Sequence, residues 1–374
     1  MIAWLLISFF VLLFLGVPIA MSLGLSAMGG ILFLGGGSTV TIAQRMFEGM
    51  NSFALLAIPL YTFAGFTMSK GGISKRLMDF CYSIVGHIYG GLAHVNVLSS
   101  MIFAGISGSA VADTAGVSGM FMPEMIRKGY SKNFTVAVTA ISSTIGIIIP
   151  PSIPMVVIAG ICGISTGKLF LGGIIPGILC GLAQMIVSYF LAKKEGVPKE
   201  PGHFTIGPVL HGLWESWPAL LMPIIIVGTI TMGIVSPTEA GVIAVVYGLF
   251  AGGIIYRELK WEDIKFAFAE TVRTSGRIFI VIGAAKLYTV MLTTAGFDKW
   301  VAKTMLGFST NPTVILIVIL LIFFIVTMFM ESIATLTLFM PILYPIALGV
   351  GINPIVLSVL ITVVIGIGLV TPPV

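Results

Sequence analysis

An apolar stretch from residue 103 to 154 is interrupted twice, first by Gly-Ile-Ser-Gly-Ser at 105–109 and then by Ile-Pro-Pro-Ser at 149–152. In a lipid bilayer, a backbone N–H or C=O group without a hydrogen bond costs several kcal/mol, so a spanning segment must be continuous helix. Breaks at membrane depth persist only where the backbone is buried in protein or lines a cavity. The stretch therefore predicts a binding site built from broken helices.

The composition identifies an integral membrane protein. Of the 374 residues, 57% are hydrophobic and 9% are charged, whereas a soluble domain has about 25% charged residues. The three cysteines lie far apart, and the four histidines show no metal-ligand spacing. No nucleophile cluster or cofactor motif is present, so we expect neither an enzyme nor a cofactor. The net charge of +5 contains no long basic run, which argues against nucleic acid as a partner.

The apolar segments predict a series of helices in two halves, residues 1–195 and 211–374. The expected membrane segments are 2–16, 18–36, 53–69, 90–127, 133–161, 169–192, 213–234, 238–256, 271–294, 314–348 and 354–373. Shorter charged segments at 41–49, 73–87, 261–268 and 298–305 are expected to lie along the membrane surface. The polar segment at 196–210 is predicted to be a cytoplasmic linker between the halves.

Segment 90–128 has two interpretations, because each arm beside the serines at 107–109 is about 17 residues long and a full span needs about 20. The arms are either two full spans or one re-entrant helical hairpin. The hairpin is favoured because its tip carries no Lys, Arg, Asp or Glu, which a loop that reaches water normally has. The apolar sequence is broken again around residues 331–335, and a second hairpin is predicted at 312–350. Broken helices are expected at 132–161 and from 353 onward, each interrupted by a double proline.

The two halves share four short matches in the same order and at nearly constant separations, as expected for an internal repeat. They are Pro18 with Pro237, 60–62 with 287–289, 121–123 with 339–341, and 146–151 with 368–373. The first half continues for 44 residues after Pro151, whereas the second stops one residue after Pro373. The repeat therefore predicts a further final span that this sequence does not contain.

The distribution of lysine and arginine predicts the orientation. If both hairpins are re-entrant, twelve lysine and arginine residues lie on one face of the membrane, in groups of three at 70–76, 127–132, 193–199 and 257–265. Four lie on the other face: Arg45, Lys168, Lys299 and Lys303. The positive-inside rule makes the first face cytoplasmic and the amino terminus periplasmic. The hairpins then enter from opposite sides, and such inverted repeats are typical of secondary transporters. If each hairpin instead crossed the membrane twice, the number of charges on each face would be the same. The charge count therefore supports the order of the segments but does not show that the hairpins are re-entrant.

Five motifs resemble the large membrane subunit of the tripartite ATP-independent periplasmic (TRAP) transporters, of the C4-dicarboxylate and sialic acid type within the ion transporter superfamily. They are GVPIAMSLG at 16–24, FAGISGSAVAD at 103–113, GIIIPPS at 146–152, SPTEA at 236–240 and GLVTPP at 368–373. The resemblance implies a bacterial inner-membrane carrier that moves as an elevator. It also implies a small four-helix membrane subunit, an extracytoplasmic binding protein that delivers an organic acid, and a sodium gradient that drives uptake.

The breaks provide candidate sodium sites, because unwound carbonyls and hydroxyls bind a hard cation through oxygen. The first candidate set is Ser107, Gly108, Ser109, Gly146, Pro150 and Ser152; the second is Ser332, Thr335, Gly368, Thr371 and Pro372. A proline removes one N–H donor, so the carbonyls of Gly146 and Ile147 are expected to be free. The alternative is that the prolines only kink packed helices.

Helix starts at the same tips are candidates for binding an organic anion, because their N–H groups and dipoles favour negative charge. The candidate substrate residues are Ser109, Asp113, Ser152, Glu331, Thr335, Thr337 and Lys286. Ionisable groups at membrane depth are costly and usually functional. The alternatives are that the two acids cap their helices and that Lys286 neutralises an acid of a partner subunit. We expect the site where both hairpin tips meet both double prolines.

The leading hypothesis is sodium-coupled uptake of a small organic acid, with the C4-dicarboxylate and sialic acid classes not distinguished. A binding-protein-independent sodium/organic anion carrier of the same superfamily is the alternative. An ion channel with the hairpins as pore loops is a weaker alternative, because the symmetry is intramolecular and inverted rather than arranged around a pore.

Overall fold

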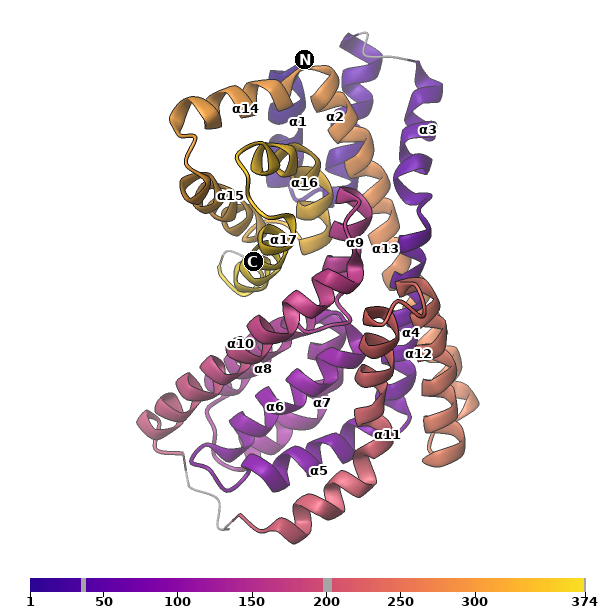
Figure 1. Ribbon diagram of the computed structural model, residues 1–374, viewed down its shortest axis with the longest axis vertical. Coiled ribbons are helices and arrows are strands. Elements are labelled where there is room, and N and C mark those ends of the chain that lie inside the picture. The colour runs from indigo at the N-terminus through magenta and orange to yellow at the C-terminus, as the bar shows by residue number, and fades with distance from the viewer. Residues whose placement is uncertain (35–37, 198–203, 373–374) are drawn as a thin grey trace. The chain divides into compact units, whose positions relative to one another are not determined.

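The computed structural model describes residues 1–34, 38–197 and 204–372, and within these ranges every regular element is a helix (Figure 1). The α-helices are α1 Ile2–Phe14, α2 Ile19–Leu34, α3 Thr39–Met50, α4 Ala57–Lys70, α5 Ile73–Val85, α6 Gly91–Ser107, α7 Ala110–Arg127, α8 Lys132–Ser143, α9 Ile153–Cys162, α10 Thr166–Lys194, α11 Ile206–Thr231, α12 Pro237–Phe250, α13 Trp261–Thr294, α14 Phe297–Phe308, α15 Pro312–Thr327, α16 Ser332–Gly349 and α17 Pro354–Gly368. Three short helical turns complete the set: Phe53–Leu56, Thr144–Ile147 and Ala251–Ile255.

Six helical segments of the described ranges are long and apolar enough to cross a membrane. They are Phe53–Lys70, Thr166–Lys194, Ile206–Thr231, Pro237–Ile255, Trp261–Thr294 and Ser332–Gly349. Together with the composition they confirm the prediction of an all-α membrane protein. The last of the six is an arm of the second predicted hairpin, so length alone does not separate a re-entrant arm from a span.

Two predicted boundaries are wrong. Helix α11 begins at Ile206, inside the segment expected to be a linker; of that segment, residues 198–203 lie outside the described ranges. Pro208 does not prevent this start, because the first-turn N–H groups of a helix lack intrahelical partners anyway. The expected surface piece at 261–268 and the span at 271–294 form one continuous helix, α13. Its charged residues do not end it, since the segment contains no proline or capping glycine between the two pieces.

The chain forms two compact units that do not coincide with its sequence halves. Unit 1 contains Met1–Leu56, Pro154–Ser165 and Thr274–Val374, and unit 2 contains Ala57–Ile153 and Thr166–Arg273. Each unit therefore combines segments from both halves, and the units are described separately below. The inverted-repeat relation between the halves stays a prediction.

In unit 2, α6 and α7 form a helical hairpin against which α8 packs (Figure 1). Its core includes Val95, Phe121 and Phe134, each at most 5% exposed. Outside the hairpin, the hydroxyl of the buried Tyr61 in α4 donates a hydrogen bond to the carbonyl oxygen of Pro237, at the start of α12, at 2.8 Å. Helix α4 in turn contacts both arms of the hairpin, α6 and α7, so the hairpin packs within the helical core of unit 2.

In unit 1, the core joins α1 and α2 to α13 and α16. Leu5, Leu23 and Leu338 are buried there around Tyr288, whose hydroxyl donates to the carbonyl oxygen of Leu5 at 2.9 Å. Helices α15, α16 and α17 follow one another and pack pairwise. They cover the segments predicted as the second hairpin and the start of the second broken helix.

Candidate functional site

The tip of the first hairpin is a tight turn between α6 and α7. Gly108 has a φ of +64°, in the left-handed region that a residue with a Cβ adopts only with strain. Ser109 then caps α7, since its Oγ accepts a hydrogen bond from the backbone N–H of Ala112 at 3.5 Å. The short polar residues at this position therefore end one helix and start the next.

This tip lies directly against the double proline of unit 2. The backbone N–H of Ile153 donates to the carbonyl oxygen of Gly108 at 3.0 Å. A Cβ added at Gly146 would lie 3.2 Å from the carbonyl oxygen of Ser109, and one added at Gly108 would overlap the carbonyl oxygen of Pro151. The residues that form the first predicted sodium set are thus brought together by the fold.

One detail of that prediction is wrong. The carbonyl oxygen of Ile147 is not free, because the hydroxyl of Ser152 donates a hydrogen bond to it. Ser152 lies five residues further along the chain, where the break lets its side chain turn back onto the preceding helical turn. A proline-freed carbonyl is therefore satisfied locally.

Asp113 lies one turn beyond the tip and is completely buried in unit 2. Neither of its carboxylate oxygens has a hydrogen-bond partner among the described residues. The side chains of Ser100 in α6 and Ser143 in α8 lie beside it. Asp113 does not cap its helix, so the capping interpretation is wrong for this residue. A buried carboxylate without a partner is strongly disfavoured unless a cation accompanies it or a proton neutralises it.

A chain of polar side chains continues from this carboxylate between α6 and α8. Asn96 donates to Thr139 Oγ1 at 2.9 Å and accepts from the hydroxyl of Ser142 at 2.9 Å. Ser100 donates to Ser142 Oγ at 3.2 Å. We did not predict this network from the sequence. The sequence feature that could have indicated this network is the four-residue spacing of Asn96 and Ser100, which places both on one helix face within a mostly apolar segment.

Replacing Gly108 by alanine is expected to destabilise the protein by about 1–2 kcal/mol, the cost of a left-handed residue with a Cβ, before the overlap with Pro151 is added. The matched control is Gly119→Ala in the middle of α7, where a Cβ meets nothing within 4 Å and alanine favours helix. Thermal unfolding of the purified protein in detergent measures both. Equal melting temperatures for the two variants would contradict the tip geometry.

The tip of the second hairpin, in unit 1, has a different arrangement. Glu331 is the cap of α16: its Oε2 accepts hydrogen bonds from the backbone N–H groups of Ile333 at 2.9 Å and Ala334 at 3.4 Å, and its Oε1 accepts from the Ser332 hydroxyl at 2.7 Å. Asp113 and Glu331 are therefore not equivalent, because one carboxylate is satisfied by its own helix and the other is not. A role of Glu331 in substrate binding stays a prediction.

The remaining candidates of unit 1 donate their hydroxyl hydrogens to backbone carbonyls four residues earlier. Thr335 donates to Glu331, Thr337 to Ile333, and Thr371 to Ile367. Each hydroxyl keeps lone pairs that can accept from a ligand or bind a cation. Gly368 packs onto Thr327 at the end of α15, where a Cβ would overlap the threonine side chain. Pro372 is exposed, and Pro373 lies outside the described residues.

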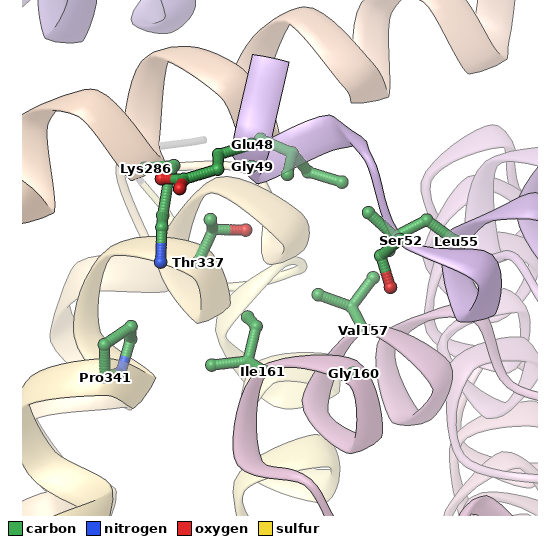
Figure 2. Close-up of a pocket in the computed structure, with 11 residues that line it drawn as sticks. Glu48, Gly49, Ser52, Leu55, Val157, Gly160, Ile161, Lys286, Thr337 and Pro341 are labelled. Atoms are coloured by element: carbon green, nitrogen blue, oxygen red, sulfur yellow. The ribbon is translucent and has the colours of Figure 1, made fainter. Parts of the chain in front are cut away.

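Unit 1 also contains a pocket of about 210 Å³ that Lys286 enters from the carboxyl-terminal third of α13 (Figure 2). It is lined by Glu48, Gly49, Ser52, Leu55, Val157, Gly160, Ile161, Ile282, Lys286, Thr337 and Pro341. Lys286 has no hydrogen bond or ion pair to any residue of the described ranges. The Lys286 side chain is exposed rather than buried, so its unpaired ammonium group is accessible to an anion that enters the pocket.

Lys286 is held in place by close packing. A Cβ added at Gly49 of α3 would lie 2.6 Å from Lys286 Cβ and 3.0 Å from its Cγ. The glycine therefore lets α3 approach the lysine stem closely, which limits the side chain to a direction along the pocket. Of the predicted substrate residues, the structure groups Lys286 with Thr337 here, and Ser109, Asp113 and Ser152 around the first tip in unit 2. Glu48 was missed because segment 41–49 was interpreted as an interfacial helix, and Ser52 lies between that segment and the span predicted from residue 53.

The family model of the DctM component of tripartite ATP-independent periplasmic transporters matches residues 6–374. The chain belongs to this DctM family. Similar proteins include the isethionate TRAP transporter permease protein of Oleidesulfovibrio alaskensis, 38% identical over 98% of this chain and 58% of that protein. The sialic acid TRAP transporter large permease protein of Vibrio cholerae is 36% identical over 97% of this chain and 84% of that protein. The C4-dicarboxylate large permease protein of Pseudomonas aeruginosa is 37% identical over 94% and 82%, respectively.

The fold of this DctM-family chain is also similar to that of a solved transporter. The YdaH transporter of Alcanivorax borkumensis aligns with a TM-score of 0.57 over 86% of this chain and 76% of that one, at 13% identity. At this identity the similarity concerns the fold alone. The family assignment confirms the resemblance found in the five sequence motifs and establishes that the chain is a membrane transport protein.

Proposed function

We propose that this DctM-family chain is the large membrane subunit of a TRAP transporter that takes up a small organic anion together with sodium ions. The single observation that carries the sodium coupling is Asp113, a fully buried carboxylate without a hydrogen-bond partner among the described residues. A sodium ion beside it would satisfy the carboxylate, with hydroxyl oxygens of Ser100 and Ser143 within its surroundings. The tip of the first hairpin supplies backbone oxygens one helical turn away.

The anionic nature of the substrate is supported by Lys286, whose ammonium group enters the pocket of unit 1 unpaired. The named relatives are described as transporters of isethionate, sialic acid and C4-dicarboxylates, all of which are organic anions. A carboxylate or sulfonate group beside Lys286 would form charge-assisted hydrogen bonds. Thr337 lies on the same pocket and offers a further polar contact.

The family membership further supports a complex of three proteins in the inner membrane of a bacterium. In this proposal, a small four-helix membrane subunit completes the permease, and an extracytoplasmic binding protein delivers the substrate. Movement of the substrate-binding part against a scaffold, as an elevator, accounts for release on the other side. A periplasmic amino terminus follows from the distribution of lysine and arginine.

Uptake into proteoliposomes that contain the complete permease, with the cognate binding protein outside, tests the proposed function. We expect uptake to stop when an inward sodium gradient is replaced by an equal potassium gradient, because the proposal makes sodium the coupling ion at Asp113. The control keeps the membrane potential constant with an ionophore. Uptake that is unchanged without sodium would contradict the coupling, and uptake without the binding protein would favour the binding-protein-independent carrier.

A further inference from the structure

The pocket of unit 1 contains two side chains of opposite charge that do not neutralise each other. Glu48 lies on α3 and Lys286 on α13, and both line the cavity (Figure 2). No ion pair joins them, since neither approaches the other within 4.0 Å in this part of the described chain. A ligand in the pocket therefore meets one cationic and one anionic group at separate positions.

Glu48 presents only acceptor oxygens to a ligand. Its Oε2 accepts from the guanidinium group of Arg45 at 2.7 Å, one turn earlier on α3. The Glu48 side chain is 57% exposed, and its Oε1 has no hydrogen-bond partner among the described residues, so this oxygen is accessible to solvent or to a ligand. An ionised carboxylate accepts hydrogen bonds and cannot donate them. The position therefore attracts a hydroxyl group of a ligand and repels a second carboxylate.

The polar groups next to Lys286 also favour a hydroxyl group of a ligand over a second carboxylate. Thr337 donates its hydroxyl hydrogen to the carbonyl oxygen of Ile333 at 2.7 Å, so toward the pocket it offers lone pairs. Ser52 lies across the cavity, and its hydroxyl can donate or accept (Figure 2). Lys286 is thus the one cation among the lining residues, and the other polar positions suit hydroxyl groups.

We propose that this pocket selects organic acids with one anionic group and at least one hydroxyl group over dicarboxylates. The anionic group lies at Lys286 and a hydroxyl group donates to Glu48. A dicarboxylate of the same length would place its second charge near Glu48, where like charges are disfavoured. This inference rests on the proposed function, because it assigns the substrate class of the same transporter.

Binding of a matched pair of acids tests the inference. The probes are 4-hydroxybutyrate and succinate, which share a four-carbon backbone with one carboxylate and differ only in the group at the other end. Equilibrium binding to the purified permease is measured by competition. We expect the hydroxy acid to bind at least about tenfold more tightly, and Glu48→Gln to reduce this ratio by about fivefold or more, because the repulsion of the second carboxylate is removed.

The matched control is Arg45→Gln, which breaks the same ion pair on α3 but leaves the charge of Glu48 in place. We expect this variant to keep or increase the preference for the hydroxy acid. Tighter binding of succinate by the unchanged protein, binding of neither acid, or an equal loss of preference in both variants would each overturn the inference. The proposed function fails separately, through sodium-independent uptake, which this binding measurement does not involve.

Discussion

Replacing Asp113 by asparagine is expected to reduce sodium-dependent uptake by about 100-fold, which corresponds to about 2.8 kcal/mol of lost coupling at 1.4 kcal/mol per tenfold change. Asparagine has nearly the same shape, so the packing of α7 against α6 and α8 is kept. The loss follows because a neutral amide cannot balance a cation that has left water. Initial rates of uptake at several sodium concentrations measure the effect, with a raised half-saturating sodium concentration as its signature.

The matched control for this variant is Asp79→Asn, which removes an exposed carboxylate from α5 in the same unit. We expect its uptake to be close to that of the unchanged protein. A second measurement, the melting temperature of the purified protein with and without sodium, separates folding from coupling. If Asp113→Asn retains the stabilisation by sodium, the carboxylate is not part of a sodium site.

Replacing Lys286 by glutamine is expected to weaken binding of the organic anion by about 10- to 100-fold, because a hydrogen bond to a charged group contributes about 1.5–3 kcal/mol. Lys286→Arg keeps the charge and is expected to retain part of the affinity, although Gly49 leaves little space for a different stem. Equilibrium binding of the substrate to the purified permease in detergent measures the change. The sodium dependence should be kept in both variants.

Lys303→Gln is the matched control for the lysine, since it removes an exposed cation from α14, outside the pocket. Its affinity for the anion should equal that of the unchanged protein. A comparable loss in both variants would show a general effect of net charge. Unchanged binding in Lys286→Gln would mean that the lysine serves another role, such as neutralising an acid of a partner subunit.

The structure separates two acids that looked equivalent in the sequence. Asp113 and Glu331 both follow a break and both lie close to a helix start. The cap of α7 is Ser109, so Asp113 falls one turn inside the helix and points into a buried space among α6 and α8. Glu331 is itself the cap of α16. A shift of one helical turn relative to the cap thus decides whether a carboxylate is satisfied by backbone N–H groups.

The sequence by itself determined the membrane class, most helix positions, the hairpin with its tip at Gly108 and the family, because these depend on local composition, on breaks in apolar runs and on short motifs. Only the tertiary structure decided the contacts of those breaks and the lining of the pocket. Ser100 and Ser143 reach Asp113 from two other helices, and Glu48 shares a cavity with Lys286 across more than two hundred residues of chain. Such neighbours depend on how helices pack rather than on their spacing along the chain.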